Sequence, residues 1–164
     1  MLRITRLSDY AVAILGQLAN SEVAVHTAKD LAARSGLPAP VVSKILKNLA
    51  RSKLVASQRG VQGGYRMARE PSLVSVADVI EAVEGPVALT ECGDNSDATC
   101  EFVGNCSVQA NWLRINQVVR RALSNISVED MISPPRAERL IQLRRSPPPT
   151  RSEKEPDNQL SEAR

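Results

Sequence analysis

Three cysteines, all within one irregular segment, are the residues of this sequence best suited to chemistry. Cys92, Cys100 and Cys106 follow the spacing C-x7-C-x5-C. Structural zinc sites usually contain C-x2-C or C-x4-C pairs and four ligands in all, so this spacing argues against zinc. Three soft thiolates on a glycine-containing loop suit an iron–sulfur cluster. The alternative, three small buried apolar residues, is disfavoured because the surrounding segment is charged.

The composition excludes several classes of protein. No apolar run approaches the roughly 20 residues that a membrane span requires. The N-terminal run MLRITRLSDYAVAIL is interrupted by charges and has no signal-peptide pattern. We therefore expect a cytoplasmic protein with no membrane partner, in a reducing compartment where clustered cysteines more often bind metal than form disulfides. With no P-loop, no G-x-S-x-G motif and one histidine, the chain is not expected to be an enzyme.

Charge is divided between two adjacent blocks of the chain. Residues 29–69 contain nine Lys or Arg and one Asp, a net charge of +8. Residues 70–110 contain eight Asp or Glu and no Lys or Arg, a net charge of −8. A basic block of this density indicates a polyanionic partner, although two solvated faces of one domain are the ordinary alternative.

Capping residues and apolar spacing predict five helices. Thr27 and Ser75 each precede an aspartate by three residues, which is typical of a helix start. Gly36 and the pair Gly85-Pro86 are suited to helix ends, and Pro40 to a first helical turn. The expected helices cover about residues 7–20, 28–35, 40–51, 76–84 and 107–125.

Two short strands are expected between the third and fourth helices. Residues 54–58 and 65–67 flank the glycine-rich run RGVQGG, which predicts a β-hairpin. Three short helices followed by a hairpin, with positive charge on the third helix and the turn, form the layout of a winged helix-turn-helix. The predicted fold class is therefore mainly α with a small β-hairpin: a winged helix-turn-helix plus a long C-terminal dimerisation helix.

The third helix is narrow enough for the major groove of DNA, where its exposed cations would neutralise phosphates. A serine on this helix and two glutamines of the hairpin, Gln58 and Gln62, could read base edges. The glycines at the hairpin tip would let an arginine approach the minor groove, although a turn alone also explains them. The predicted DNA-binding residues are Ser43, Lys44, Lys47, Arg51, Arg59, Gly60, Gly63 and Gly64.

Apolar residues of the longest expected helix recur at alternating intervals of four and three. This pattern favours packing against the same helix of a second subunit, although a helix lying on its own domain can show it too. A homodimer is expected once DNA binding is considered. From Val108 onward, the predicted interface residues are Trp112, Ile115, Val119, Ala122 and Ile126.

These elements give a four-part organisation of the chain. The C-terminal part holds six of the ten prolines among charged and small polar residues, which predicts disorder. The parts are a DNA-binding domain (1–69), a linking helix with the cysteine loop (70–106), a dimerisation helix (107–132) and a Pro-rich disordered tail (133–164).

Three runs of the sequence, LRITRLSDYAVAIL, VVSKILKNLARSKLV and RGVQGGYRM, resemble the IscR/NsrR family of winged-helix transcription regulators. The resemblance covers about residues 1–132. The cysteine loop followed by NWLRINQVV is most similar to the branch that regulates SUF-type iron–sulfur cluster assembly. The sequence departs from IscR at Ser43, where IscR carries a glutamate that discriminates between promoter sequences. The promoter sequences that IscR prefers therefore do not predict those that this chain prefers.

This resemblance implies a cytoplasmic homodimer, a repressor or activator, whose affinity for double-stranded promoter DNA depends on a bound cluster. The implied cluster is 2Fe–2S rather than 4Fe–4S, and the cluster-assembly machinery would donate it. In the family the third helix reads the major groove and a wing arginine enters the minor groove. These roles correspond to Ser43, Lys44 and Lys47 in the helix and to Arg59 in the wing.

A cluster bound by three cysteines needs a fourth ligand. Gln109 occupies the position of the histidine ligand of IscR, and an amide is a poor iron ligand. In NsrR-type members a carboxylate near the start of the first helix, donated by the partner subunit, completes the site, and Asp9 matches that position. Asp9 also suits a helix N-terminus electrostatically. The other candidates are Glu91, Asp94, Asp97, Glu101 and His26, the last expected to be a surface or capping residue.

Two other functions fit the same residues. A nitric oxide- or redox-sensing repressor of the NsrR kind would use the same scaffold and the same three cysteines. An iron–sulfur carrier or electron-transfer protein would carry the basic face incidentally, which the net charge of +8 over residues 29–69 disfavours.

Overall fold

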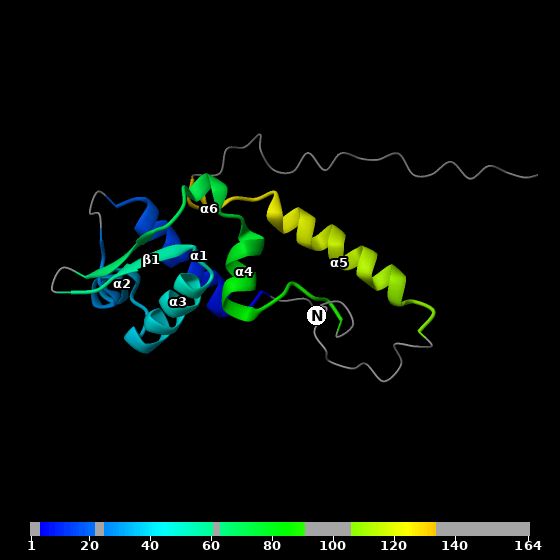
Figure 1. The fold of residues 1–164 in the computed structure, drawn as a ribbon, viewed down its shortest axis with the longest axis horizontal. Coiled ribbons are helices and arrows are strands. Elements are labelled where there is room, and N and C mark those ends of the chain that lie inside the picture. Colours follow the sequence, from blue (N-terminus) through cyan, green and yellow to red (C-terminus); the bar gives the residue numbers. More distant parts are fainter. Residues whose placement is uncertain (1–3, 22–24, 61–62, 91–105, 134–164) are drawn as a thin grey trace, which may run out of the picture. The chain divides into compact units, whose positions relative to one another are not determined.

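The computed structural model describes residues 4–21, 25–60, 63–90 and 106–133. Within these ranges the chain forms helices and one two-stranded antiparallel sheet (Figure 1). Three helices followed by a hairpin confirm the predicted winged helix-turn-helix. The elements are α1 (Arg6–Ala19), α2 (Ala28–Ser35), α3 (Ala39–Arg51), β1 (Val55–Gln58), β2 (Gly64–Met67), η1 (Pro71–Leu73), α4 (Val76–Glu84), α5 (Gln109–Ser124) and α6 (Val128–Ile132).

The helix ends lie close to the positions that the capping residues predict. At the start of α2, the Thr27 hydroxyl accepts a hydrogen bond from the Asp30 amide at 3.1 Å, and the Asp30 carboxylate accepts one from the Thr27 amide at 3.2 Å. The Thr27 hydroxyl, 2.6 Å from Asp30 Oδ2, also donates to this carboxylate, and together with the Thr27 amide it favours the ionised form and holds the pKa of Asp30 below its ordinary value of 3.8. Gly36 ends α2 with a φ of +70°.

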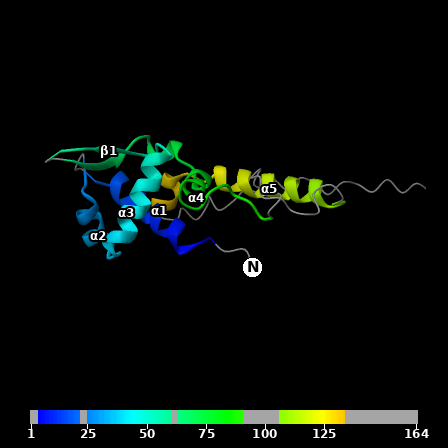
Figure 2. The same cartoon turned by 60° about the horizontal axis from the view of Figure 1, so that its bottom comes forward.

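The core lies where α1, α3, α4 and the hairpin meet, and Figure 2 shows α1 and α3 packed together. Each helix contributes the apolar stripe that its sequence predicts. Tyr65 and Met67 of β2 pack against the edge of this core, as expected for a wing folded onto its domain. The large side chains with no exposed surface are Ile14, Leu15, Leu31, Val42, Ile45, Leu46, Leu49, Val74, Val79 and Val128.

The short helix α6 was not expected from the sequence. Its N-cap is Ser127, whose hydroxyl accepts from the Asp130 amide at 3.0 Å in a third capping box. α6 packs against α1 at Gly16, where an added Cβ would lie 2.7 Å from Ile132 Cγ2. The helix therefore needs a glycine on α1 for close approach.

Backbone pairing joins the chain before α4 to the chain before α6. The amide of Val76 donates to the carbonyl of Ile126 at 2.8 Å, and the amide of Val128 donates to the carbonyl of Val74 at 2.8 Å. These bonds flank an antiparallel bridge between Ser75 and Ser127, the N-caps of the two helices. After α4, the segment that contains the three cysteines (the cysteine segment) and α5, the chain thus returns to the residues that precede α4.

Several predictions concern residues outside the described ranges. Residues 91–105 include Cys92, Cys100 and the four acidic alternatives for a fourth ligand. Gln62 also lies outside the described ranges, as does all of the predicted disordered tail except its first residue. No helix of the described part is long and apolar enough to cross a membrane.

Candidate nucleic-acid interface and cysteine segment

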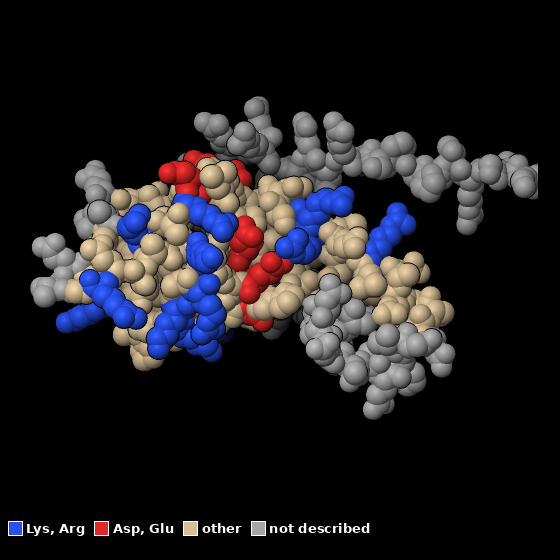
Figure 3. Space-filling model, in the orientation of Figure 1, with Lys and Arg blue, Asp and Glu red and all other residues tan. Residues whose placement is uncertain are grey.

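One side of α3 carries exposed cations while the opposite side is buried in the core. Lys44, Lys47 and Arg51 are all exposed and lie at intervals of three and four, which places them on one helix face. Ser43 is half-buried beside them. Figure 3 shows Lys and Arg side chains gathered over the α3 side of the molecule and acidic side chains over α4 and α6. The structure therefore brings the predicted residues of α3 together.

The hairpin requires its turn glycines for structural reasons. Gly60 has a φ of +115°, and the Gly63 amide donates to the Gly60 carbonyl at 2.9 Å. A Cβ on Gly63 would lie 2.6 Å from the carbonyl oxygen of Gln58. Arg59, next to this turn, is exposed. The turn alone thus accounts for Gly60 and Gly63, while Arg59 remains available to a partner.

The root of the wing pairs with the chain before α2. The Tyr65 amide donates to the His26 carbonyl at 2.7 Å, and the His26 amide donates to the Tyr65 carbonyl at 2.9 Å. A Cβ on Gly64 would lie 2.7 Å from the carbonyl carbon of His26. This close approach explains why glycine begins β2.

The expectation that His26 is a surface or capping residue was wrong. His26 is only 6% exposed, and its Nε2 lies 2.7 Å from Ser21 Oγ. The cause is the pairing with Tyr65, which draws residue 26 beneath the wing. Its burial and bonding give His26 a structural role.

Arg66 was not among the predicted DNA-binding residues, although it was counted in the basic block. Its partner across the hairpin is Ala56, and the next pair, Val55 and Met67, faces the core. Because side chains alternate along a strand, Arg66 points away from the core, and it is exposed. The two-residue period of β2 could have identified it.

The described end of the cysteine segment leads directly into α5. Cys106 is a half-buried free thiol, and its carbonyl accepts a hydrogen bond from the Gln109 amide at 3.4 Å. Asp9, in the first turn of α1, is exposed, as a ligand donated to another subunit must be. Among the residues that the structure describes, no three His, Cys, Asp or Glu side chains are grouped to hold a metal ion.

A polar clamp joins the end of α4 to the start of α1, close in sequence to Asp9. The carboxylate of Glu84 accepts hydrogen bonds from the hydroxyls of Thr5, at 2.7 Å, and Ser8. Ser8 is 1% exposed, so the bond satisfies a buried hydroxyl. The clamp fixes α1 where α4 ends and the chain continues towards the cysteines.

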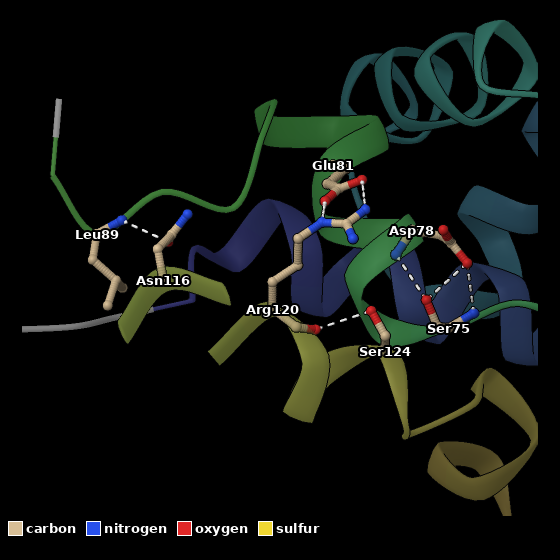
Figure 4. A network of polar contacts seen from close by, with 7 residues as sticks. All are labelled: Ser75, Asp78, Glu81, Leu89, Asn116, Arg120 and Ser124. Atoms are coloured by element: carbon tan, nitrogen blue, oxygen red, sulfur yellow. Dashed lines mark hydrogen bonds and ion pairs between the residues drawn. The ribbon is translucent and has the colours of Figure 1, made fainter. Parts of the chain in front are cut away.

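Two side chains of α5 reach back to residues that precede the cysteines (Figure 4). Asn116 Oδ1 accepts a hydrogen bond from the Leu89 amide at 3.2 Å. The Arg120 guanidinium binds Glu81 of α4 through two bonds of 2.6 and 3.2 Å. The Glu81 carboxylate raises the pKa of Arg120 by hydrogen bonding and charge attraction.

The predicted apolar seam of α5 is largely uncovered within one chain. Val108, Trp112 and Ile115 are 48%, 40% and 44% exposed. Val119 is half-buried, Ala122 is exposed, and Ile126 lies two residues beyond the end of α5. The seam is therefore an unpartnered face whose last predicted member belongs to the pairing with Val76.

A helix-turn-helix with a cationic third helix and a hairpin wing defines a winged-helix DNA-binding protein. The chain belongs to the Rrf2 family, described as iron-dependent transcriptional regulators, whose model matches residues 4–134. It is thus a DNA-binding transcription regulator and not an enzyme, and the resemblance to IscR-like regulators is confirmed.

Individual relatives support this assignment. The HTH-type transcriptional regulator IscR of Escherichia coli is 29% identical over 133 residues, which cover 80% of this chain and 81% of IscR. The structure of CymR, the global cysteine regulator of B. subtilis, has 26% identity and a TM-score of 0.60, and the match covers 80% of this chain and 97% of CymR. The structure of T. potens IscR has 28% identity and a TM-score of 0.57, with 80% and 86% covered.

Proposed function

We propose that this regulator responds to an iron–sulfur cluster and controls genes of SUF-type cluster assembly. Cys92, Cys100 and Cys106 hold the cluster, which the cluster-assembly machinery supplies. The observation that carries the proposal is the position of Cys106, directly before α5. Since α5 contacts α4, and α4 packs against α3, the cysteine segment is linked through packed helices to the basic helix.

The donor chemistry fits such a cluster. Thiolates are the usual ligands of iron–sulfur clusters, and Cys106 is a free thiol. Asp9 of the partner subunit is the fourth ligand in this proposal, and the exposure of Asp9 supports it. When bound, a cluster of the 2Fe–2S type supplies an exchangeable link between the three cysteines. A carboxylate ligand makes that link more open to exchange than a fourth thiolate would.

The homodimer forms through the exposed seam of α5, with Trp112 and Ile115 at its centre. An apolar seam at heptad spacing packs well against a second copy. In a dimer, holding the cysteine segment fixes the start of α5, and with it the separation of the two α3 helices. DNA half-sites about 34 Å apart demand a fixed separation, so a small shift changes DNA affinity.

On DNA, each α3 lies in the major groove. Lys44, Lys47 and Arg51 bind phosphates, and Ser43 at the edge of the stripe reads a base. The exposed Arg59 enters the minor groove beside the wing. The backbone at Gly60 and Gly63 allows the tip of the wing to approach closely, whereas Gly64 accommodates the His26 backbone at the root of the wing. Arg66 adds a phosphate contact from the outward face of β2.

The test compares DNA affinity in three forms of the protein: anaerobically reconstituted, cluster-free, and with all three cysteines changed to alanine. Absorption and Mössbauer spectra of the reconstituted form identify the cluster. We expect the reconstituted form to differ in affinity from the other two by tenfold or more, on the order of typical coupling energies. Equal affinities in all three forms would refute cluster sensing while leaving DNA binding intact. Release of DNA at physiological nitric oxide doses would instead assign an NsrR-like signal.

A further inference from the structure

The most deeply buried side chain of α5 is polar. Asn116 is the one residue of α5 that is buried, at 7% exposure. A buried amide must be hydrogen-bonded to offset the water that it loses. Its Oδ1 accepts the amide of Leu89, three residues before Cys92. The middle of α5 therefore holds the chain where it enters the cysteine segment.

The other end of the cysteine segment is held by the same helix. Cys106 lies three residues before the first residue of α5, Gln109, whose amide donates a hydrogen bond to the Cys106 carbonyl. Gln109 and Asn116 lie seven residues apart, about 10 Å along the helix axis. Both ends of the segment are thus fixed on one helix, which reduces the chain entropy that is lost when the three cysteines close around a ligand.

Arg120 extends this contact to the DNA-binding half of the molecule. It lies one helical turn beyond Asn116 on the same face and binds Glu81 of α4 through two hydrogen bonds. α4 also packs against α3. α5 is therefore connected through Glu81 and α4 to the helix that carries Lys44 and Lys47.

We propose that Asn116 and Arg120 form a polar latch that positions the cysteine segment and couples it to α3. Asn116 holds the start of the segment in place for ligand binding. Arg120 transmits the resulting position of α5 to α4 through Glu81. The proposal rests on the proposed cluster-dependent function, and it assigns roles to two residues that are not themselves ligands.

Asn116→Leu tests the positioning role. Asn111→Leu makes the same change at an exposed position of α5 and is the control. In the apoprotein, NMR should show faster amide exchange at Leu89 in Asn116→Leu only. In the reconstituted protein, iron release to a chelator should be about tenfold faster in Asn116→Leu, as expected for a lost buried hydrogen bond. Asn111→Leu should remain near wild type.

Wild-type exchange at Leu89 in Asn116→Leu would overturn the latch, and so would wild-type iron release by that variant. A wild-type protein that takes up no iron would instead refute the proposed function, and the positioning role with it. These two failures are distinguished by the behaviour of the wild type alone.

A charge exchange tests the coupling role. Glu81→Arg and Arg120→Glu each place like charges together, whereas the double variant restores an opposite pair. The ratio of DNA affinities with and without cluster should fall towards one in each single variant and recover in the double variant. A ratio unchanged in both single variants, beside a cluster-dependent wild type, would overturn the coupling.

Discussion

Substitution of Gly64 by alanine should detach the wing from the chain before α2. An added Cβ would lie 2.7 Å from both the His26 carbonyl carbon and Val25 Cγ1, whereas ordinary contact begins at about 3.4 Å. The strands must separate, and the two His26–Tyr65 hydrogen bonds of 2.7 and 2.9 Å must lengthen. Overpacking costs about 1–3 kcal/mol and each of the two weakened hydrogen bonds about 1 kcal/mol, so we expect a loss of about 3–5 kcal/mol.

Denaturant unfolding of Gly64→Ala measures this loss, and a fluorescence titration with promoter DNA measures the effect on binding. In thermal unfolding we expect a Tm lower by about 10–20 °C, and we expect weaker DNA binding because Arg59 and Arg66 move with the hairpin. Ser57→Ala, an exposed change on β1, is the control and should alter stability by less than about 0.5 kcal/mol. Wild-type stability of Gly64→Ala would refute the steric reasoning.

Three further predictions follow from single contacts. Lys47→Gln should reduce the slope of log DNA affinity against log salt concentration by about 0.9 per lost phosphate contact. Arg114→Gln on α5 is the control and should leave the slope unchanged. Equal slopes for Lys47→Gln and the wild type would exclude a phosphate contact at Lys47. Because Asp30 has a lowered pKa in the folded protein, its contribution to stability is present above pH 3.8 and lost as pH falls through the lower folded value. Asp30→Ala should therefore lower the Tm at neutral pH, with the difference shrinking as pH falls through the folded pKa of Asp30, and a difference that stays constant in acid would contradict the pKa direction. Gly16→Ala should destabilise the wild type by about 1–2 kcal/mol through the clash with Ile132. In an Ile132→Ala background the same change should stabilise the protein by up to about 1 kcal/mol. A change in unfolding free energy of the same sign in both backgrounds would refute the clash.

Local sequence signals predicted the elements that local interactions determine. Thr27 with Asp30 and Ser75 with Asp78 marked the starts of α2 and α4, and the apolar period placed Lys47 on the exposed side of α3. α6 carries the same capping signal in Ser127 and Asp130, but its five residues are too few to show a helical period.

Contacts between distant residues were not predictable from one sequence. The burial of His26 depends on pairing with Tyr65, and the latch joins Asn116 to Leu89, 27 positions away, through a backbone amide that every residue except proline carries. Asp9 shows a different limit of sequence analysis. The sequence identifies a carboxylate near the start of the first helix, but its proposed role as a ligand depends on the arrangement of a second subunit.

The pairing of Ser75 with Ser127 has a consequence for how such regulators can diversify. The helix α4 that follows Ser75 belongs to the core, but the chain from Gly85 to Ile126 makes an excursion that ends beside the start of α4, held by two backbone bonds of 2.8 Å. Insertions or new ligand residues within this excursion leave the framework of the reader intact. One DNA-reading body can thereby host sensors of different chemistry, and chimaeras that keep α4 and exchange only the chain between Gly85 and Ser127 should fold.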